Sequence, residues 1–272
     1  MKTWVSGLLI IGMCAFAMAP VAWHAATSLK TASESTRIPP TLFPESPTLA
    51  NYEELFERRP FLRYCLNSFV IASLASLLCI TAGAAAAYPL AHATAVMRAR
   101  VAAGLLVLAF FPPIAFLLPL YEMVRFAGLI NHPWGLIVPY AGLNLPLAIW
   151  LLTGYFRSLP SDLREAAAMD GLSPFETFRK VILPLSMPAL ATVGVLVFIF
   201  SWNEFMFALT FINNDPSRTA TLAVATLSGA FVYEIPWGLV AAGVIASSIP
   251  LILMVLFLQK SIVAGLTAGS AK

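Results

Sequence analysis

Long apolar runs separated by short polar segments dominate the chain. Crossing a bilayer as a helix takes about twenty apolar residues. Six runs meet that length, at residues 4–23, 64–90, 101–121, 135–156, 186–211 and 237–258. Helix is the expected conformation because a segment in lipid must satisfy its backbone hydrogen bonds internally. The pattern predicts an all-α, multi-pass protein of the cell (inner) membrane, with six spans in a single transmembrane domain covering residues 1–272.

The composition supports this class. Hydrophobic residues make up 60% of the chain and charged residues 11%, against about 25% charged in soluble domains. The basic residues are scattered, so no stripe for nucleic acid is expected. Neither the three cysteines nor the three histidines are spaced for a metal site. The first run is longer than the usual signal-peptide core of about 7–15 residues, so we expect it to be retained.

The distribution of Lys and Arg predicts the orientation. With the N-terminus inside, nine basic residues fall in short inner segments and seven in longer outer ones. Inner segments are therefore denser in positive charge, as the positive-inside rule requires. Both termini are expected in the cytoplasm. Residues 27–63 then form an external loop, Pro-rich at first and helical at about 51–56, that rests on the membrane surface.

The polar segment 159–184, between the fourth and fifth spans, carries the most local information. Asp162 is a candidate N-cap, and Glu165 stands three residues later, where a capping-box side chain reaches back. The alanines 166–168 favour helix and add no bulk. Gly171 is the expected left-handed stop. A short helix with a small-residue face is the prediction.

A second short helix follows in the same segment. Ser173 is its expected cap, Glu176 stands three residues later, and Pro184 is expected to end it. Capping residues and stop residues of this kind occur at the ends of helices of every function. On helix chemistry alone, the alanine-faced helix is equally a docking surface for another protein or a plain connector of two spans.

Several motifs carry a family resemblance: Glu165-Ala166-Ala167, then Asp170-Gly171, then Leu183-Pro184 after a fixed interval. This segment resembles the EAA loop of permeases from binding-protein-dependent ABC importers, with Val181 where the family has Ile. Residues 67–68, 201–205 and 259–269 are similar to the maltose-type, carbohydrate-uptake subfamily, although the last three residues depart from it.

The resemblance implies a division of labour. The EAA helix would dock into a cleft of a cytoplasmic ATPase, with Glu165 as the charged contact, Ala166 and Ala167 as the close-packed face and Gly171 as the bend. The chain has no Gly-x-x-x-x-Gly-Lys-Ser/Thr loop. ATP and Mg²⁺ would be bound by two partner ATPase subunits, so this chain is itself no enzyme and needs no cofactor. A second homologous permease, an extracytoplasmic solute-binding protein and membrane lipid complete the expected partners.

The solute path is less defined by the sequence. Glu204 is an acid inside the fifth run, and acids within spans are often functional. Trp202 and Asn203 beside it offer an aromatic face and an amide, and Asn144 lies in the fourth run. Each of these is equally explained by a hydrogen bond that packs helices together.

Other function classes remain open at this stage. The same loop occurs in importers of glycerophosphodiesters and other small polar solutes. An ion-coupled secondary transporter would need more intramembrane acids than Glu204. A membrane-embedded enzyme would need convergent catalytic groups, and the acidic helix near residue 53 is more typical of a solvated face.

Overall fold

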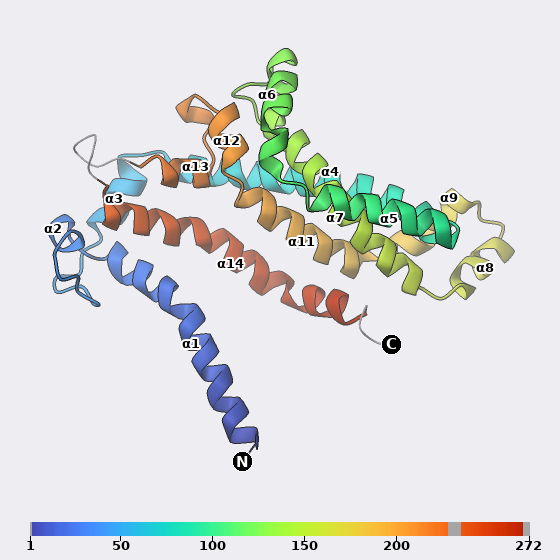
Figure 1. The fold of residues 1–272 in the computed structure, drawn as a ribbon, viewed down its shortest axis with the longest axis horizontal. Helices are drawn as coiled ribbons and strands as arrows, with labels where there is room; N and C mark the ends of the chain where they lie inside the picture. Colours follow the sequence, from blue (N-terminus) through green and yellow to red (C-terminus); the bar gives the residue numbers. More distant parts are fainter. Residues whose placement is uncertain (1, 228–234, 269–272) are drawn as a thin grey trace. The chain divides into compact units, whose positions relative to one another are not determined.

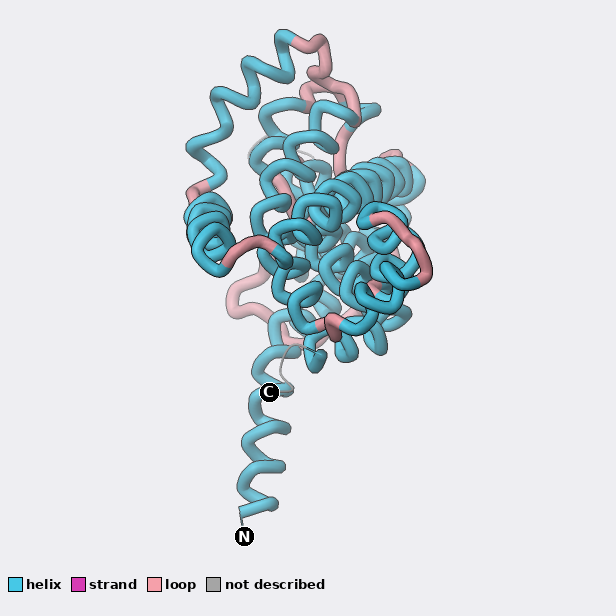
Figure 2. Tube along the Cα trace, turned by 90° about the vertical axis from the view of Figure 1, so that its right-hand side faces the viewer, coloured by secondary structure: helices cyan, strands magenta, loops and turns pink. Residues whose placement is uncertain are grey.

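The computed structural model describes residues 2–227 and 235–268. These residues form helices and loops and contain no strand (Figure 2). Four helices include long apolar stretches able to cross a membrane: α1 (Lys2–Ser28), α4 (Phe61–His92), α7 (Trp134–Ser158) and α14 (Trp237–Ala268) (Figure 1). This confirms the all-helical, membrane-spanning class.

The third and fifth predicted spans are not straight, continuous helices. In place of 101–121 the chain forms α5 (Ala95–Ala109), a 3₁₀ turn η1 (Pro113–Phe116) and α6 (Leu117–Phe126), bent by 86° at the break. The bend falls at Pro112 and Pro113, because proline lacks the amide N–H that would continue the helix. In place of 186–211 the chain forms α11 (Met187–Trp202) and a separate α12 (Met206–Phe211).

The number of membrane crossings therefore depends on the bent pairs. The helical segment Pro174–Leu185 and α11 form the second bent pair, with an angle of 75° between them. Six membrane spans result only when each bent pair is counted as one span. The six-span topology and the cytoplasmic termini stay predictions.

The chain divides into two compact units whose boundaries fall inside α4 and α14. Residues 1–66 and 218–251 form the first unit. It contains α2 (Ala32–Ser35), α3 (Ala50–Glu57) and α13 (Ala220–Ala225). Leu55 of α3 is fully buried in its core, together with Phe61 and Leu239. The helix expected near residues 51–56 of the outer loop is thus confirmed as α3.

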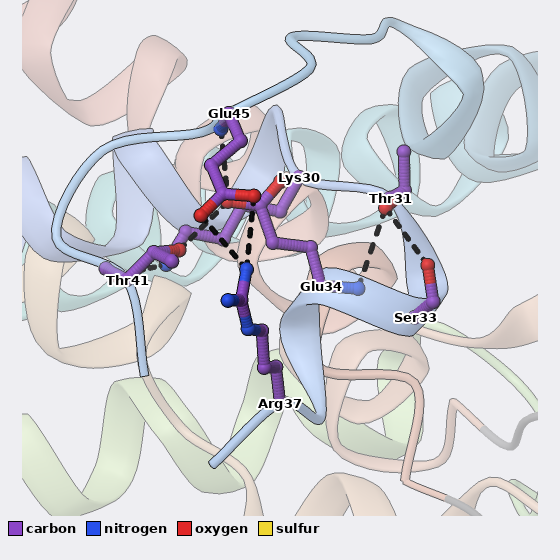
Figure 3. A network of polar contacts seen from close by, with 7 residues as sticks. All are labelled: Lys30, Thr31, Ser33, Glu34, Arg37, Thr41 and Glu45. Carbon is purple, nitrogen blue, oxygen red and sulfur yellow. Dashed lines mark hydrogen bonds and ion pairs between the residues drawn. The ribbon is translucent and has the colours of Figure 1, made fainter. Parts of the chain in front are cut away.

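A polar network orders the loop around α2 in this first unit (Figure 3). Glu34 is 8% exposed and accepts hydrogen bonds from the Thr41 hydroxyl at 2.7 Å and the Glu45 amide at 2.9 Å. These bonds lower the pKa of Glu34, the Thr41 bond most. Lys30, 3% exposed, donates to the Thr41 carbonyl, and Arg37 pairs with Glu45 at 2.8 Å. The Pro-rich segment is therefore ordered by buried polar contacts.

Residues 67–217 and 252–272 form the second unit. Its core joins α4, α7 and α11 around Cys79, Leu152 and Val197. Where α4 meets α11, the Ser76 hydroxyl donates to the Gly194 carbonyl at 2.8 Å. A Cβ on Gly194 would lie 2.5 Å from the Ile80 Cδ1. Any side chain at this position would require Ile80 to shift, so glycine favours the close approach, as at other small-residue contacts between membrane helices.

Candidate functional site

The polar segment 159–184 begins with α8 (Asp162–Met169). Asp162 is its first helical residue and not its cap, so the predicted capping by Asp162 and Glu165 is wrong. Ser161 holds the cap position with helical dihedrals, φ −61° and ψ −32°, and no side chain bonds the first amides. Both acids remain in the first turn, where the helix dipole favours negative charge.

Gly171 ends α8 as the sequence predicts. Its φ is +76°, a conformation that costs side-chain-bearing residues free energy. The Leu172 amide donates to the Ala167 carbonyl and the Gly171 amide to the Ala168 carbonyl, both at 3.0 Å. This pair of bonds is a Schellman motif. It fixes a sharp hinge between the two short helices.

The second short helix, α9 (Pro174–Thr177), starts with the predicted capping box. The Ser173 hydroxyl accepts from the Glu176 amide at 3.3 Å, and the Glu176 carboxylate accepts from the Ser173 amide at 3.0 Å. Lys180 pairs with Glu176 at 2.8 Å. The bond from Lys180, followed by those from Ser173, lowers the pKa of Glu176 to about 2. The cap is therefore charged at neutral pH.

The chain stays helical beyond the position where Pro184 was expected to stop it. A π-helical turn, η2 (Phe178–Ile182), follows α9, and α10 (Leu183–Leu185) contains Pro184 at its start. The turn comes at Ser186, whose hydroxyl donates to the Ile182 carbonyl at 2.7 Å. A proline is tolerated in the first turn of a helix, since its missing amide would be unpaired there anyway.

The predicted coupling residues differ in exposure. Glu165, Ala166, Asp170, Gly171 and Pro184 are exposed, and Leu183 is half-buried against the core. Ala167 is only 4% exposed and faces the interior of its own unit. Two apolar side chains flank the hinge and were not singled out from the sequence: Met169 is 90% exposed and Phe175 68%. Their signal was an apolar residue on each side of a polar hinge, which is typical of a contact surface.

An aromatic cluster ties this hinge to two long helices. The Phe178 ring lies 4.8 Å from that of Tyr88 in α4 and 6.3 Å from that of Phe156 in α7. The Tyr88 and Phe156 rings are 5.8 Å apart in an edge-to-face arrangement. Such pairs add about 0.5–1.5 kcal/mol each beyond their buried area. A displacement of the hinge is thus resisted by both α4 and α7.

Two of the four candidate path residues, Asn144 and Glu204, meet at Tyr140 of α7, which sequence reasoning missed. The Tyr140 hydroxyl donates to Glu204 at 2.5 Å, and the Asn144 amide donates to the Tyr140 carbonyl at 2.8 Å. Glu204 also accepts from the amides of Phe207 at 2.9 Å and Ala208 at 3.2 Å. Glu204 therefore caps α12 and joins it to α7.

The two neighbours of Glu204 have different environments. Trp202 is 2% exposed and stacks on Phe198, with ring centroids 5.7 Å apart. Asn203 is exposed and donates to the Ile199 carbonyl at 2.8 Å. Of the four path candidates, Asn203 alone is exposed, while Asn144 and Glu204 are half-buried.

Comparison with known proteins gives a consistent result. Residues 64–267 match the family described as binding-protein-dependent transport system inner membrane component. The trehalose transport system permease protein of Mycobacterium tuberculosis is 39% identical over 97% of this chain and 94% of its own length. The trehalose/maltose transport system permease protein of Thermococcus litoralis is 39% identical, over 97% of this chain and 96% of its own.

Two further proteins widen the picture. The sulfoquinovosyl glycerol transport system permease protein of Agrobacterium fabrum is 37% identical over 93% of this chain and 88% of its own. A solved bacterial ABC transporter involved in the import of the acidic polysaccharide alginate has a chain of the same fold. Its TM-score is 0.77 with 95% of each chain covered, at 21% identity. A membrane permease fold, an EAA-type segment and a family match over most of the length agree, and the chain belongs to the family of inner-membrane components of binding-protein-dependent transport systems.

Proposed function

We propose that the chain is the sugar-translocating permease subunit of an ABC importer. The observation that carries this is full-length similarity, at 37–39% identity, to permeases whose names specify trehalose, maltose and sulfoquinovosyl glycerol. Glycosides are the solute class that these names share. In this proposal ATP and Mg²⁺ are bound by separate ATPase subunits, since the chain itself has no Gly-x-x-x-x-Gly-Lys-Ser/Thr loop.

The segment 159–184, which contains the Gly171 hinge, is proposed as the contact with one of those ATPases. Its exposed surface carries Glu165, Ala166, Met169 and Phe175 around the Gly171 turn. Two short helices that present a small residue and two exposed apolar side chains suit close insertion into a groove. Binding of ATP then biases alternating access only through the different affinity of the ATPases for the two permease states.

The remaining partners follow from the family. A second homologous permease would complete the path, and an extracytoplasmic solute-binding protein would deliver the sugar. The hinge and both termini lie in the cytoplasm in this proposal.

The test uses the importer assembled from its own subunits in proteoliposomes, with uptake of labelled trehalose and maltose and ATP hydrolysis measured together. Uptake should require ATP and the solute-binding protein. The double variant Glu165→Lys, Gly171→Val should lose solute-stimulated ATPase activity and uptake. A matched control, Glu57→Lys, reverses an exposed charge on α3 and should leave both unchanged.

Two outcomes would refute the proposal. Wild-type levels of coupling and uptake in the double variant would exclude docking through the hinge. Sugar uptake driven by a proton or sodium gradient, without ATP and without an ATPase, would exclude an ABC importer.

A further inference from the structure

A polar cavity lies in the first unit. It has a volume of about 390 Å³ and is bounded by α2, α3 and the start of α14. Six of its lining residues bear polar groups or an aromatic ring: Ser35, Thr36, Asn51, Glu54, Arg58 and Trp237. Its size falls within the range of small-molecule sites, about 300–1,000 Å³.

The walls of this cavity are fixed by buried contacts. The Asn51 amide donates to the carbonyls of Ser28 and Lys30, both at 2.9 Å, which anchors α3. A Cβ on Gly238 would lie 2.8 Å from the Asn51 amide nitrogen, so α14 packs directly on this side chain. The network around the buried Glu34 orders α2, the third wall (Figure 3). A preformed cavity of this kind saves a ligand the cost of ordering it.

Several lining groups are left with unused binding capacity. Trp237 is 52% exposed. Arg58 is exposed, and no ion-pair partner for its guanidinium occurs in the described part of the chain. Glu54 pairs with Arg59 only at the long distance of 3.7 Å. With its nitrogen engaged, Asn51 still offers a carbonyl oxygen as an acceptor.

This combination selects the chemistry of the ligand. An anion would be attracted by Arg58 but repelled by Glu54. A cation would be attracted by Glu54 but repelled by Arg58. An apolar molecule would take water away from the carboxylate, the guanidinium and the amide without replacing their hydrogen bonds. A neutral polyhydroxylated ring satisfies all of them, because each hydroxyl both donates and accepts and the apolar ring face can cover the indole.

We infer that this cavity is a carbohydrate subsite for a neutral mono- or disaccharide. Trp237 supplies the stacking surface, and Glu54, Arg58 and Asn51 supply the directional hydrogen bonds. The inference rests on the proposed function for its sugar class. It adds a candidate sugar site built from residues of the first unit.

The test places 5-fluorotryptophan in the chain, within the importer assembled from its own subunits in nanodiscs, and follows fluorine NMR. The Trp237 resonance is assigned with Trp237→Phe. On titration with trehalose or maltose it should shift saturably, whereas the Trp150 resonance should not. Trp237→Ala and Arg58→Ala should each weaken binding about tenfold or more, the effect of losing a good directional contact. Both side chains are exposed, so neither change opens a cavity in the core.

Trp150→Ala is the matched control, because it removes a tryptophan of similar exposure, 41%, from the second unit. It should bind sugar as the wild type does. Absence of any sugar-dependent shift at Trp237, or an equal shift with glycine betaine, would overturn the inference. So would a shift that occurs only when the solute-binding protein is added without sugar, since the cavity would then be a protein-docking surface.

This outcome is distinguishable from failure of the proposed function. Normal ATP-driven sugar uptake with a silent Trp237 would refute the subsite and leave the importer. Saturable sugar binding at Trp237 without any uptake of sugar would support the subsite and refute the proposed importer function.

Discussion

Replacing Glu204 by alanine should detach α12 from α7. In the structure this carboxyl group accepts at least three hydrogen bonds: from the Tyr140 hydroxyl and from the amides of Phe207 and Ala208. These donors have no ready substitute, because Tyr140, Phe207 and Ala208 are each at most 1% exposed. Alanine therefore leaves three buried donors unpaired.

The size of the effect follows from that count. Hydrogen bonds within membrane proteins have measured values averaging about 0.6 kcal/mol, with a maximum of about 1.7. Three of them give about 2–5 kcal/mol of lost unfolding free energy for Glu204→Ala. Tyr140→Phe removes one bond and keeps both amide caps, so about 0.6–1.7 kcal/mol is expected. Glu204→Gln retains one acceptor oxygen and should fall between the two.

The assay is equilibrium unfolding of the purified chain in mixed detergent, combined with hydrogen exchange of the amides in α12 and α11. Exchange should rise in α12 for Glu204→Ala and stay low in α11. A loss below about 0.5 kcal/mol with unchanged α12 protection would refute the capping argument. Loss of transport in Glu204→Gln with α12 still protected would instead assign this side chain to the solute.

Three further changes test other contacts. Gly194→Val should cost about 1–3 kcal/mol of unfolding free energy by overpacking against α4, while Gly104→Val, where a Cβ meets nothing within 4 Å, should cost little; equal losses would contradict the close approach. Because the pKa of Glu176 is lowered from 4.5 to about 2, its stabilisation of α9 is present above about pH 4.5 and lost as the pH falls toward 2. Hydrogen exchange of residues 173–182, corrected for intrinsic rates, should rise over that range in the wild type; Glu176→Gln should exchange fast throughout, and a wild-type profile in that variant would contradict the assignment. If the aromatic cluster links the hinge to α12, ATP binding to the ATPase subunits should change hydrogen exchange in α12. Phe178→Ala should leave ATP binding intact but remove that change in exchange, and an undiminished change would exclude the cluster as a link.

Local signals in the sequence predicted the hinge well. Gly171 and the Ser173–Glu176 box were recognisable because each depends on hydrogen bonds between residues at most five positions apart. The Asp162 cap was wrong for a related reason. Asp162 is a good cap residue, but Ser161 before it already has helical dihedrals, so Asp162 lies inside the helix and neither side chain caps it.

The interruption of the fifth predicted span could not be read from the apolar pattern. Hydropathy registers that residues 186–211 are apolar, but α11 ends at Trp202 because Glu204 turns to cap a new helix. That cap is completed by Tyr140, 64 residues away in the sequence. A contact at such separation leaves no periodic signal. The same holds for Ala167, whose burial depends on what the rest of the unit places against it.

One helix connects the two regions of the second unit. Phe156, near the end of α7, contacts Phe178 of the hinge, and Tyr140 near its start holds Glu204. The two residues are 16 positions apart, about 24 Å along a helix. A displacement of the hinge thus reaches the α11–α12 break through packed side chains and one continuous helix. Contiguity alone does not establish energetic coupling.

What makes α7 more than a spacer is that its far end carries a single hydroxyl, that of Tyr140, bonded to the carboxyl group of Glu204, which also caps α12. A small tilt of α7 must then lengthen the Tyr140–Glu204 bond or carry α12 with it. The second course moves a short helix that is joined to α11 only by residues 203–205, and such an element can change position without disturbing the core around Leu152 and Val197.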